Sequence, residues 1–318
     1  MGSPDKALVS YREALALTPG DAEVIYNIGD QYLELGQTDE AAASFREALT
    51  IKPDHIGALI SLHACLYGDE NLEEAAECLE TVLKFAPDHL LSCFYLGMLR
   101  DHSGDSRAAV EHFERLKKAQ DGDAIIDCWN YVKSAMNEKP HLFGPTIDGL
   151  TIGLDAARVD GLVMEFGVRF GTTIRQISDI ADQDVHGFDT FQGLPEAWLE
   201  EPEGAYSTLG ELPEVSENVH LHVGLFEDSL PPFLIKFDGP VRFMNVDCDL
   251  YSSTKMIFDH LSDRIVSGTI LVFDEYLLNS TWREDEYKAF QESVEKFGWT
   301  YEYLAFSLFS KQAVVRIR

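Results

Sequence analysis

The chain has few cations for its size: 25 Lys plus Arg stand against 55 Asp plus Glu in 318 residues, a formal net charge of −30. A charge of that sign repels phosphate backbones and anionic membrane surfaces. The sequence also lacks an apolar run of the ~20 residues that a membrane span needs. We therefore expect no nucleic acid and no membrane among its partners.

Cysteine is scarce and scattered. The five cysteines form no C-x-x-C pair, and their number is odd: Cys65, Cys78, Cys93, Cys128 and Cys248. A disulfide framework needs an even, closely spaced set, so none is expected here. The composition is typical of a protein in a reducing cytoplasm, and we predict that location.

A repeat fills the first part of the chain, where Pro19, Pro53 and Pro87 lie 34 residues apart. The unit from Ala22 to Pro53 has small, aromatic and turn residues in the slots of the 34-residue tetratricopeptide pattern. These are Ile28, Gly29, Tyr32, Gly36, Ala41, Phe45, Ala48 and Pro53. Residues 1–120 thus resemble a tetratricopeptide repeat (TPR) array.

The array begins in the middle of a repeat, because Ala7, Tyr11, Ala14 and Pro19 match only the second helix of a unit. A repeat cannot bury its apolar face alone. We therefore expect either that the natural chain continues N-terminally or that another chain covers this end. The repeats could serve as a spacer or self-association surface, or bind a protein partner in a groove.

A connecting helix and linker follow at residues 121–147, and the pattern then changes. From 148 to 318 short apolar runs such as "LVMEF", "VHGFD" and "TILVFD" alternate with helical segments. This alternation predicts an α/β domain with a parallel sheet covered on both faces. In such sheets ligands bind beyond the carboxyl ends of the strands.

The first strand tip, "EFGVRFGTT", places Glu165 before a turn made by Gly167 and Gly171, with Thr172 opening the next helix. The turn has neither the Gly-Lys-Ser/Thr of a P-loop nor the G-x-G-x-x-G spacing, which disfavours ATP and NAD. An acidic tip beside a glycine turn suits a cationic cofactor with free ribose hydroxyls, such as S-adenosylmethionine. Asp189, about twenty residues further on, is placed either to bind the ribose or to cap a turn.

Five ordered motifs in this half carry a family resemblance. They are "EFGV..G.T", "GFDTFQGLPE", "GAYSTLGELPEVSENVHLHVGLFEDSLP", "VDCDLYSST" and "LVFDEY". Together they resemble the macrocin O-methyltransferase (TylF-like) group of class I S-adenosylmethionine-dependent methyltransferases. The resemblance implies a Rossmann-like, seven-stranded sheet, S-adenosylmethionine as methyl donor and a divalent cation, usually Mg²⁺. It also implies methylation of a hydroxyl on a sugar or similar natural product, under a mobile lid from Trp198 to Asn218.

Four carboxylates at the ends of two neighbouring strands suggest a bound divalent cation, independently of the family resemblance. Asp247 and Asp249 follow one strand, and Asp274 and Glu275 follow the next. Repelling carboxylates of this kind need a cation, and their oxygen ligands suit Mg²⁺. By resemblance, Asp247, Asp274 and Glu275 bind the metal and Asp249 is the base, although the choice between Asp247 and Asp249 stays open. Glu275 stands where the family usually has aspartate.

Other interpretations of these residues remain. Asp249 could cap the helix that opens at "LYSSTK", and Asp274 and Glu275 could be ordinary acids of a solvated loop. In "GLFEDSLP", Phe226 and Asp228 are candidates to contact the adenine, although an exposed acidic loop would look the same.

The sequence thus predicts a metal-dependent O-methyltransferase joined to TPR repeats. One alternative is a metal-independent enzyme or one that methylates nitrogen. Another is a TPR scaffold with an inactive methyltransferase domain. No motif names the acceptor, which we expect to be a small molecule or a saccharide.

Overall fold

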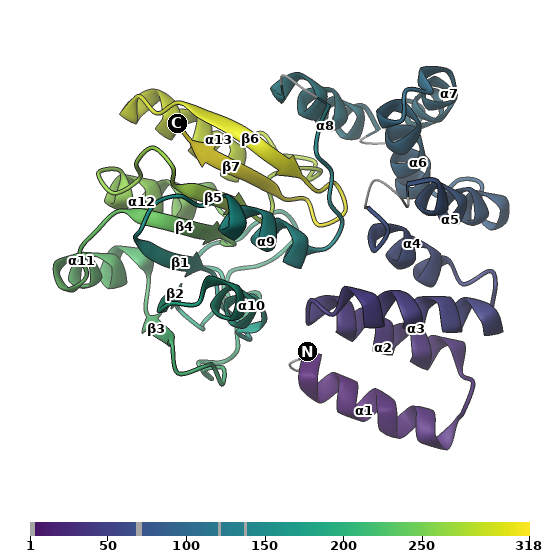
Figure 1. Ribbon diagram of the computed structural model, residues 1–318, viewed down its shortest axis with the longest axis horizontal. Coiled ribbons are helices and arrows are strands. Elements are labelled where there is room, and N and C mark those ends of the chain that lie inside the picture. The colour runs from purple at the N-terminus through teal and green to yellow at the C-terminus, as the bar shows by residue number, and fades with distance from the viewer. Residues whose placement is uncertain (1–3, 68–71, 120–121, 137–138) are drawn as a thin grey trace. The chain divides into compact units, whose positions relative to one another are not determined.

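The computed structural model describes residues 4–67, 72–119, 122–136 and 139–318. The chain divides into two compact units, one of Met1–Pro145 with Ser307–Phe309 and one of Thr146–Phe306 with Ser310–Arg318 (Figure 1). The sequence-based boundaries, 1–120, 121–147 and 148–318, stay a prediction, and the junction of the first two lies outside the described residues.

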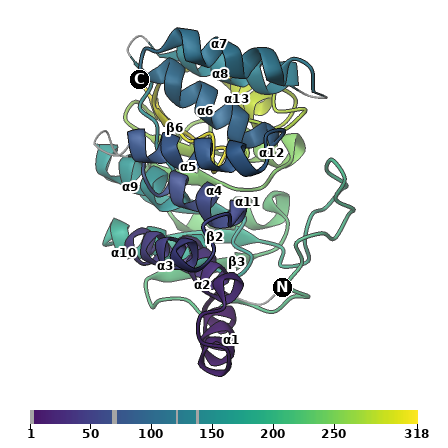
Figure 2. The same ribbon diagram turned by 90° about the vertical axis from the view of Figure 1, so that its right-hand side faces the viewer.

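The first unit is helical, and neighbours along the chain are neighbours in its stack (Figures 1 and 2). Its helices are α1 (Pro4–Leu17), α2 (Ala22–Glu34), α3 (Thr38–Ile51), α4 (Ile56–Ala64), α5 (Leu72–Phe85), α6 (Leu90–His102), α7 (Ser106–Leu116) and α8 (Gly122–Ala135). The predicted repeat helices are therefore present.

The repeat residues explain how these helices pack in pairs. A Cβ on Gly29 of α2 would lie 2.7 Å from the Phe45 ring of α3, and one on Gly97 would lie 2.9 Å from Phe113 in the corresponding pair. Glycine is therefore required where two helices approach this closely. His55 and His89, 34 residues apart, cap α4 and α6, because each ring Nδ1 accepts from a backbone N–H of the helix that follows.

The second unit is built on a seven-stranded sheet in the order β3-β2-β1-β4-β5-β7-β6. Its strands are β1 (Leu162–Phe166), β2 (Val185–Asp189), β3 (Val219–Val223), β4 (Val241–Val246), β5 (Ile270–Phe273), β6 (Tyr301–Phe306) and β7 (Ala313–Ile317). The all-parallel expectation is wrong for β7, which pairs antiparallel with both β5 and β6. Only six residues join β6 to β7, and a parallel crossover needs a dozen or more.

Helices cover both faces of this sheet. α9 (Thr146–Ala156) and α10 (Thr172–Ala181) pack together on one face, and α11 (Phe226–Lys236), α12 (Tyr251–Leu261) and α13 (Glu286–Phe297) follow one another on the other (Figure 1). The chain runs from β1 outward to β3 and then returns to β4 beside β1. The carboxyl ends of β1 and β4 therefore form the switch point at which α/β sheets bind ligands.

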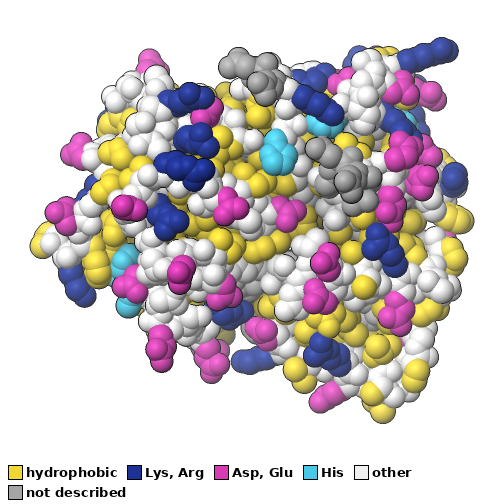
Figure 3. All heavy atoms as spheres, in the orientation of Figure 1, with side chains coloured by type: hydrophobic (Ala, Val, Ile, Leu, Met, Phe, Trp, Pro, Cys, Tyr) yellow, Lys and Arg dark blue, Asp and Glu magenta, His cyan; other side chains and the backbone are white. Residues whose placement is uncertain are grey.

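The acidic composition is visible at the surface. Asp and Glu side chains are spread over the face shown in Figure 3 rather than gathered in one patch. None of the helices within the described ranges is long and apolar enough to cross a bilayer.

Candidate active site

The glycine loop after β1 is held against the tip of β4. Gly167 has φ +96°, and a Cβ there would lie 1.7 Å from the carbonyl oxygen of Asp247. Gly171, with φ +74°, is the N-cap of α10, which begins at Thr172 and has no side-chain cap bond. The loop therefore combines close backbone approach with the free N–H groups of a helix N-terminus.

Asp189 at the end of β2 fastens this loop. Its Oδ2 accepts from the amides of Val168 and Arg169, both at 2.8 Å, and its Oδ1 accepts from the amide of Phe191 at 2.7 Å. The turn-capping interpretation therefore holds. A carboxylate oxygen can accept two hydrogen bonds, so Asp189 Oδ1, which accepts one, could also accept from a ribose hydroxyl; this ribose contact stays a prediction.

The loop after β3 lies beside the end of β2, because the Gly224 amide donates to the carbonyl oxygen of Asp189 at 3.0 Å. Phe226 opens α11 and sets its ring edge-to-face on Phe166 of β1, with centroids 5.3 Å apart. Asp228 is exposed in the same first turn. The glycine loop thus lies at the tip of β1 and Phe226 beyond the tip of β3, with the tip of β2 between them.

Glu165 lies inside this edge of the sheet and is fully buried. Its Oε1 accepts from Asn245 of β4 at 3.1 Å, and its Oε2 has no hydrogen-bond partner. Burial raises the pKa of Glu165 well above its usual range, and the charge of Asp274 adds to the rise. A buried, incompletely bonded carboxyl at a ligand edge is typical of a functional group.

The four acids at the ends of β4 and β5 share one electrostatic environment. Burial raises the pKa of Asp247 well above normal, and Asp274 and Asp249 contribute next. Burial followed by the charge of Glu275 raises the pKa of Asp249 to about 7 and that of Asp274 to about 7. The structure thus brings together the acids that the sequence analysis grouped.

Asp249 does not cap the next helix, so that interpretation is wrong. α12 begins at Tyr251 with Leu250 as its N-cap, and no side chain bonds the cap. Asp249 instead lies at the apex of a three-residue turn with φ +61°, in which the Leu250 amide donates to the carbonyl oxygen of Cys248 at 2.6 Å. Such a turn is strained for a residue other than glycine, and strain of this kind is concentrated at functional sites.

Glu286, which the sequence analysis missed, is fully buried at the start of α13. Its Oε2 accepts from the Glu275 amide at 3.3 Å, and its Oε1 has no hydrogen-bond partner. Burial, followed by the charges of Asp249 and Asp274, raises its pKa well above normal. In the sequence it looks like an ordinary acid in the first turn of an exposed helix.

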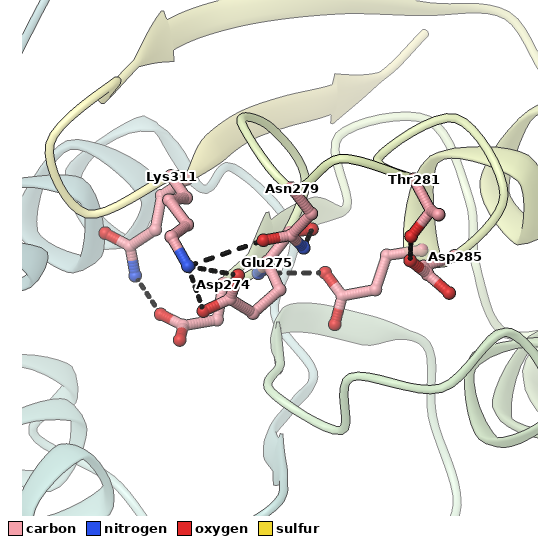
Figure 4. Close-up of polar contacts among 8 residues, drawn as sticks. Asp274, Glu275, Asn279, Thr281, Asp285 and Lys311 are labelled. Carbon is pink, nitrogen blue, oxygen red and sulfur yellow. Dashed lines mark hydrogen bonds and ion pairs between the residues drawn. The ribbon is translucent and has the colours of Figure 1, made fainter. Parts of the chain in front are cut away.

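Two further side chains come from the end of the loop that precedes β7. Lys311 Nζ lies 3.0 Å from Glu275 Oε2 and 3.4 Å from Asn279 Oδ1 (Figure 4). Gln312 donates from Nε2 to Asp274 Oδ1 at 2.6 Å. Phe273 pairs with Ala313, so the antiparallel register brings these residues opposite Asp274 and Glu275. Neither contact has a signal in the sequence, because the apolar pattern predicts the last strand without its partner strand.

The segment predicted to form a lid also reaches the site. The Tyr206 ring lies 5.0 Å from the Arg169 guanidinium of the glycine loop. Burial raises the pKa of Tyr206, and Asp249 is the largest charge that adds to the rise. Trp198 packs with Leu194 and Leu250, which fastens the start of this segment beside the Asp249 turn. Its mobility stays a prediction.

Within the part of the chain that the structure describes, no group of three or more His, Cys, Asp or Glu side chains lies in an arrangement that could hold a metal ion. Both oxygens of Glu275 are within 3.2 Å of Lys311 Nζ. The sequence-based set Asp247, Asp274 and Glu275 is therefore not assembled as three converging ligands.

The switch-point sheet, the glycine loop and the acidic tips are the arrangement that the sequence analysis expects of a methyltransferase domain. Comparison with family models agrees: residues 164–276 match a methyltransferase domain, and residues 1–120 match the cilia and flagella-associated protein 70 middle TPR-like domain. The chain therefore joins TPR-like repeats to an S-adenosylmethionine-dependent methyltransferase domain, as predicted.

Solved structures similar to the chain include both kinds of domain. The O-methyltransferase NovP is 22% identical over 54% of this chain and 78% of its own, with a TM-score of 0.42. The calicheamicin methyltransferase CalS11 is 19% identical over 66% and 93%, with a TM-score of 0.42. MamA is 20% identical over 35% and 66%, with a TM-score of 0.33. No curated protein matches the sequence.

Proposed function

We propose that this chain is an S-adenosylmethionine-dependent O-methyltransferase, assisted by a divalent cation, that methylates a hydroxyl of a sugar or a natural-product-like acceptor. The observation that carries the proposal is the group of acids at the adjoining tips of β1, β4 and β5. Besides burial, Asp274 and Asp249 each raise the pKa of Asp247, and Asp249 also raises that of Asp274. Several carboxyl groups with raised pKa at the ligand-binding ends of the strands suit removal of a proton from a hydroxyl.

The cofactor would lie along the tips of β1, β2 and β3. The glycine loop of Gly167 and Gly171 would accommodate its methionine part, Asp189 its ribose, and Phe226 with Asp228 its adenine. Glu165 and the N-terminus of α10 at Thr172 complete the cofactor-binding residues. Glu165 and Asp189 are acids that suit a ligand carrying an ammonium and a sulfonium.

The proposal includes a divalent cation because of the type of donor in the acidic group, although no three of the described acids already lie in a metal-binding arrangement. The donors are hard oxygens, they repel one another, and Glu165 and Glu286 each have a buried oxygen without a hydrogen-bond partner. Asp247 and Asp274 would hold the ion, joined by Glu275 when it leaves Lys311. A bound cation of this kind lowers the pKa of the acceptor hydroxyl.

Asp249 is the base in this proposal. A pKa raised to about 7 lets its carboxylate accept a proton and release it again near neutral pH. Its strained turn points to a fixed position in the site rather than a solvated loop. The proton released when the acceptor oxygen takes the methyl group passes to Asp249, while Tyr206 of the lid segment shields the site from water.

The test is transfer of labelled methyl to a panel of sugar and natural-product hydroxyls, with and without EDTA. Asp247→Ala and Asp274→Ala should abolish metal-dependent methylation and leave cofactor affinity within several-fold by calorimetry, because neither residue is assigned to the cofactor. Asp263→Ala, an exposed acid after α12, is the matched control and should keep activity. If both site variants stay active, the mechanism is wrong. Activity that is insensitive to EDTA supports the metal-independent alternative.

We further propose that the repeats bind a protein partner or mediate self-association. Phe85, Leu90 and Leu91 are large apolar side chains exposed on the repeat helices. Exposed apolar groups that lie close in a chain are typical of contact surfaces. Light scattering of the purified chain over a concentration series would detect self-association, and a mass that stays monomeric would leave a second protein as the partner.

A further inference from the structure

Arg169 is a cation at the tip of β1, in a chain with 55 Asp plus Glu against 25 Lys plus Arg. Its backbone has φ +47°, and its amide donates to Asp189 Oδ2 at 2.8 Å. Its guanidinium carbon lies 4.9 Å from the centre of the Phe170 ring and 5.0 Å from that of the Tyr206 ring. The side chain is therefore held by stacking as well as by its backbone.

Stacking leaves the hydrogen-bond donors of this guanidinium unused. The N–H donors of an arginine lie in the plane of the group, so they stay available when an aromatic ring covers a face. Arg169 is exposed, and among the described residues no carboxylate forms an ion pair with it. A guanidinium that is held in place without an acidic partner is available to an anion from outside the chain.

The other half of the stack is fixed by the loop that follows β2. The Phe191 carbonyl oxygen accepts from the Ser207 hydroxyl at 3.3 Å, and the Phe191 amide donates to Asp189 Oδ1 at 2.7 Å. Tyr206 itself has φ +65°, in the left-handed region that favours glycine. Asp189 thus fastens the backbone on both sides of the stack, through the Arg169 amide and through Phe191.

The stack lies on the side of the site where the proposed function places the acceptor. Next to Tyr206, the Ala205 side chain packs against the cluster that contains Leu250. Leu250 belongs to the turn whose apex is Asp249. Burial and then the charge of Asp249 raise the pKa of Tyr206. The Arg169 guanidinium is therefore near the proposed base.

We propose that Arg169 binds an anionic group of the acceptor, a phosphate or a carboxylate, and so selects charged acceptors. The inference rests on the proposed function for the reacting hydroxyl, but it requires no metal. A guanidinium bonds either anion through two parallel N–H donors. The acids around Asp249 repel an anion, so an acceptor of this kind needs a cation beside it to bring its hydroxyl to the base.

The test is calorimetric binding of three related probes to the full chain saturated with S-adenosylhomocysteine. The probes are methyl glucoside, glucose 1-phosphate and glucuronic acid, which differ in charge. At least one charged probe should bind the wild type roughly ten-fold or more tightly than methyl glucoside, and the stronger of the two distinguishes phosphate from carboxylate. Arg169→Met should weaken that charged probe roughly ten-fold or more and leave methyl glucoside unchanged.

Three further variants control for loss of charge and of stacking. Arg158→Met removes an exposed arginine that bonds the backbone carbonyl oxygens of Asp155 and Ala157, and it should bind every probe as the wild type does. Tyr206→Phe keeps the ring and should keep the affinity for the charged probe. Tyr206→Ala removes the stack and should weaken that affinity several-fold.

The outcomes separate this inference from the proposed function. Equal affinity of the wild type for charged and neutral probes overturns it, as does an equal loss in Arg169→Met and Arg158→Met. Weaker S-adenosylmethionine binding by Arg169→Met would assign Arg169 to the carboxylate of the cofactor and would also overturn it. Methyl transfer to neutral hydroxyls alone overturns the inference and leaves the proposed function standing, whereas absence of S-adenosylmethionine binding refutes the proposed function.

Discussion

Gly167→Ala should disable the cofactor loop, because Gly167 faces the backbone of the neighbouring strand. Its new Cβ would lie 1.7 Å from the carbonyl oxygen of Asp247, so the tips of β1 and β4 must separate by roughly 1 Å or more. The φ of +96° adds about 1–2 kcal/mol of strain for alanine. Two tip hydrogen bonds, from Asp247 to Phe166 and from Gly167 to Phe188, would also weaken, each worth about 1 kcal/mol.

The magnitude is therefore about 3–4 kcal/mol in the free energy of unfolding of the α/β unit, with a marked loss of S-adenosylmethionine affinity. Gly239→Ala is the matched control, since Gly239 has φ +106° but no atom within 4 Å of its Cβ position. It should cost only the backbone strain of about 1–2 kcal/mol and leave cofactor affinity intact.

Urea unfolding followed by near-ultraviolet circular dichroism, together with calorimetric titration of S-adenosylmethionine, measures both effects. If Gly167→Ala and Gly239→Ala lose the same stability and neither loses cofactor affinity, then the close approach of β1 and β4 is not what positions the loop. That result would refute the reasoning.

Two further predictions concern buried titratable groups. Burial lowers the pKa of His63 to about 4, so between about pH 6.5 and pH 4 the unfolded chain takes up a proton that the folded repeats do not. The free energy of unfolding therefore falls by about 3 kcal/mol as the pH is lowered through this window. Hydrogen exchange of the α4 amides, measured against pH, should show a steeper loss of protection in the wild type than in His63→Phe. Parallel loss of protection in the two proteins would contradict this prediction. Glu286→Gln should keep the bond from the Glu275 amide and near-native activity, whereas Glu286→Leu should cost about 1–3 kcal/mol and lower kcat. Thermal unfolding and initial rates compare the two variants, and equal behaviour would show that Glu286 does not position the Asp274–Glu275 turn.

The repeats were predictable in detail because their information is local. Gly29 and Phe45 are 16 residues apart, and their contact repeats as Gly97 and Phe113. The period, the small residues and the turns all act within one helix pair, so the sequence pattern carries the packing with it. The family-model match over residues 1–120 agrees with that prediction.

The strand tips were predictable for a related reason. The strands "LVMEF" and "VHGFD" coincide with β1 and β2, because short β-branched and aromatic runs between helices favour buried parallel strands. The grouping of the acids at the strand ends could be predicted because the carboxyl ends of parallel strands lie at the same edge of a sheet. Asp249 shows the limit of such rules: its apparent capping position gave no warning of the turn in which it lies.

The sequence by itself determined the two kinds of domain, the parallel strands and the acids at their ends, since all of these depend on periodicity and on neighbours along the chain. Only the tertiary structure decided what surrounds those acids. Glu286, Lys311 and Gln312 reach Asp274 and Glu275 from α13 and from the loop that leads into the antiparallel strand β7, 11 to 38 residues further along the chain. Such contacts depend on strand order and register, which pairing across the whole sheet sets and no local pattern encodes.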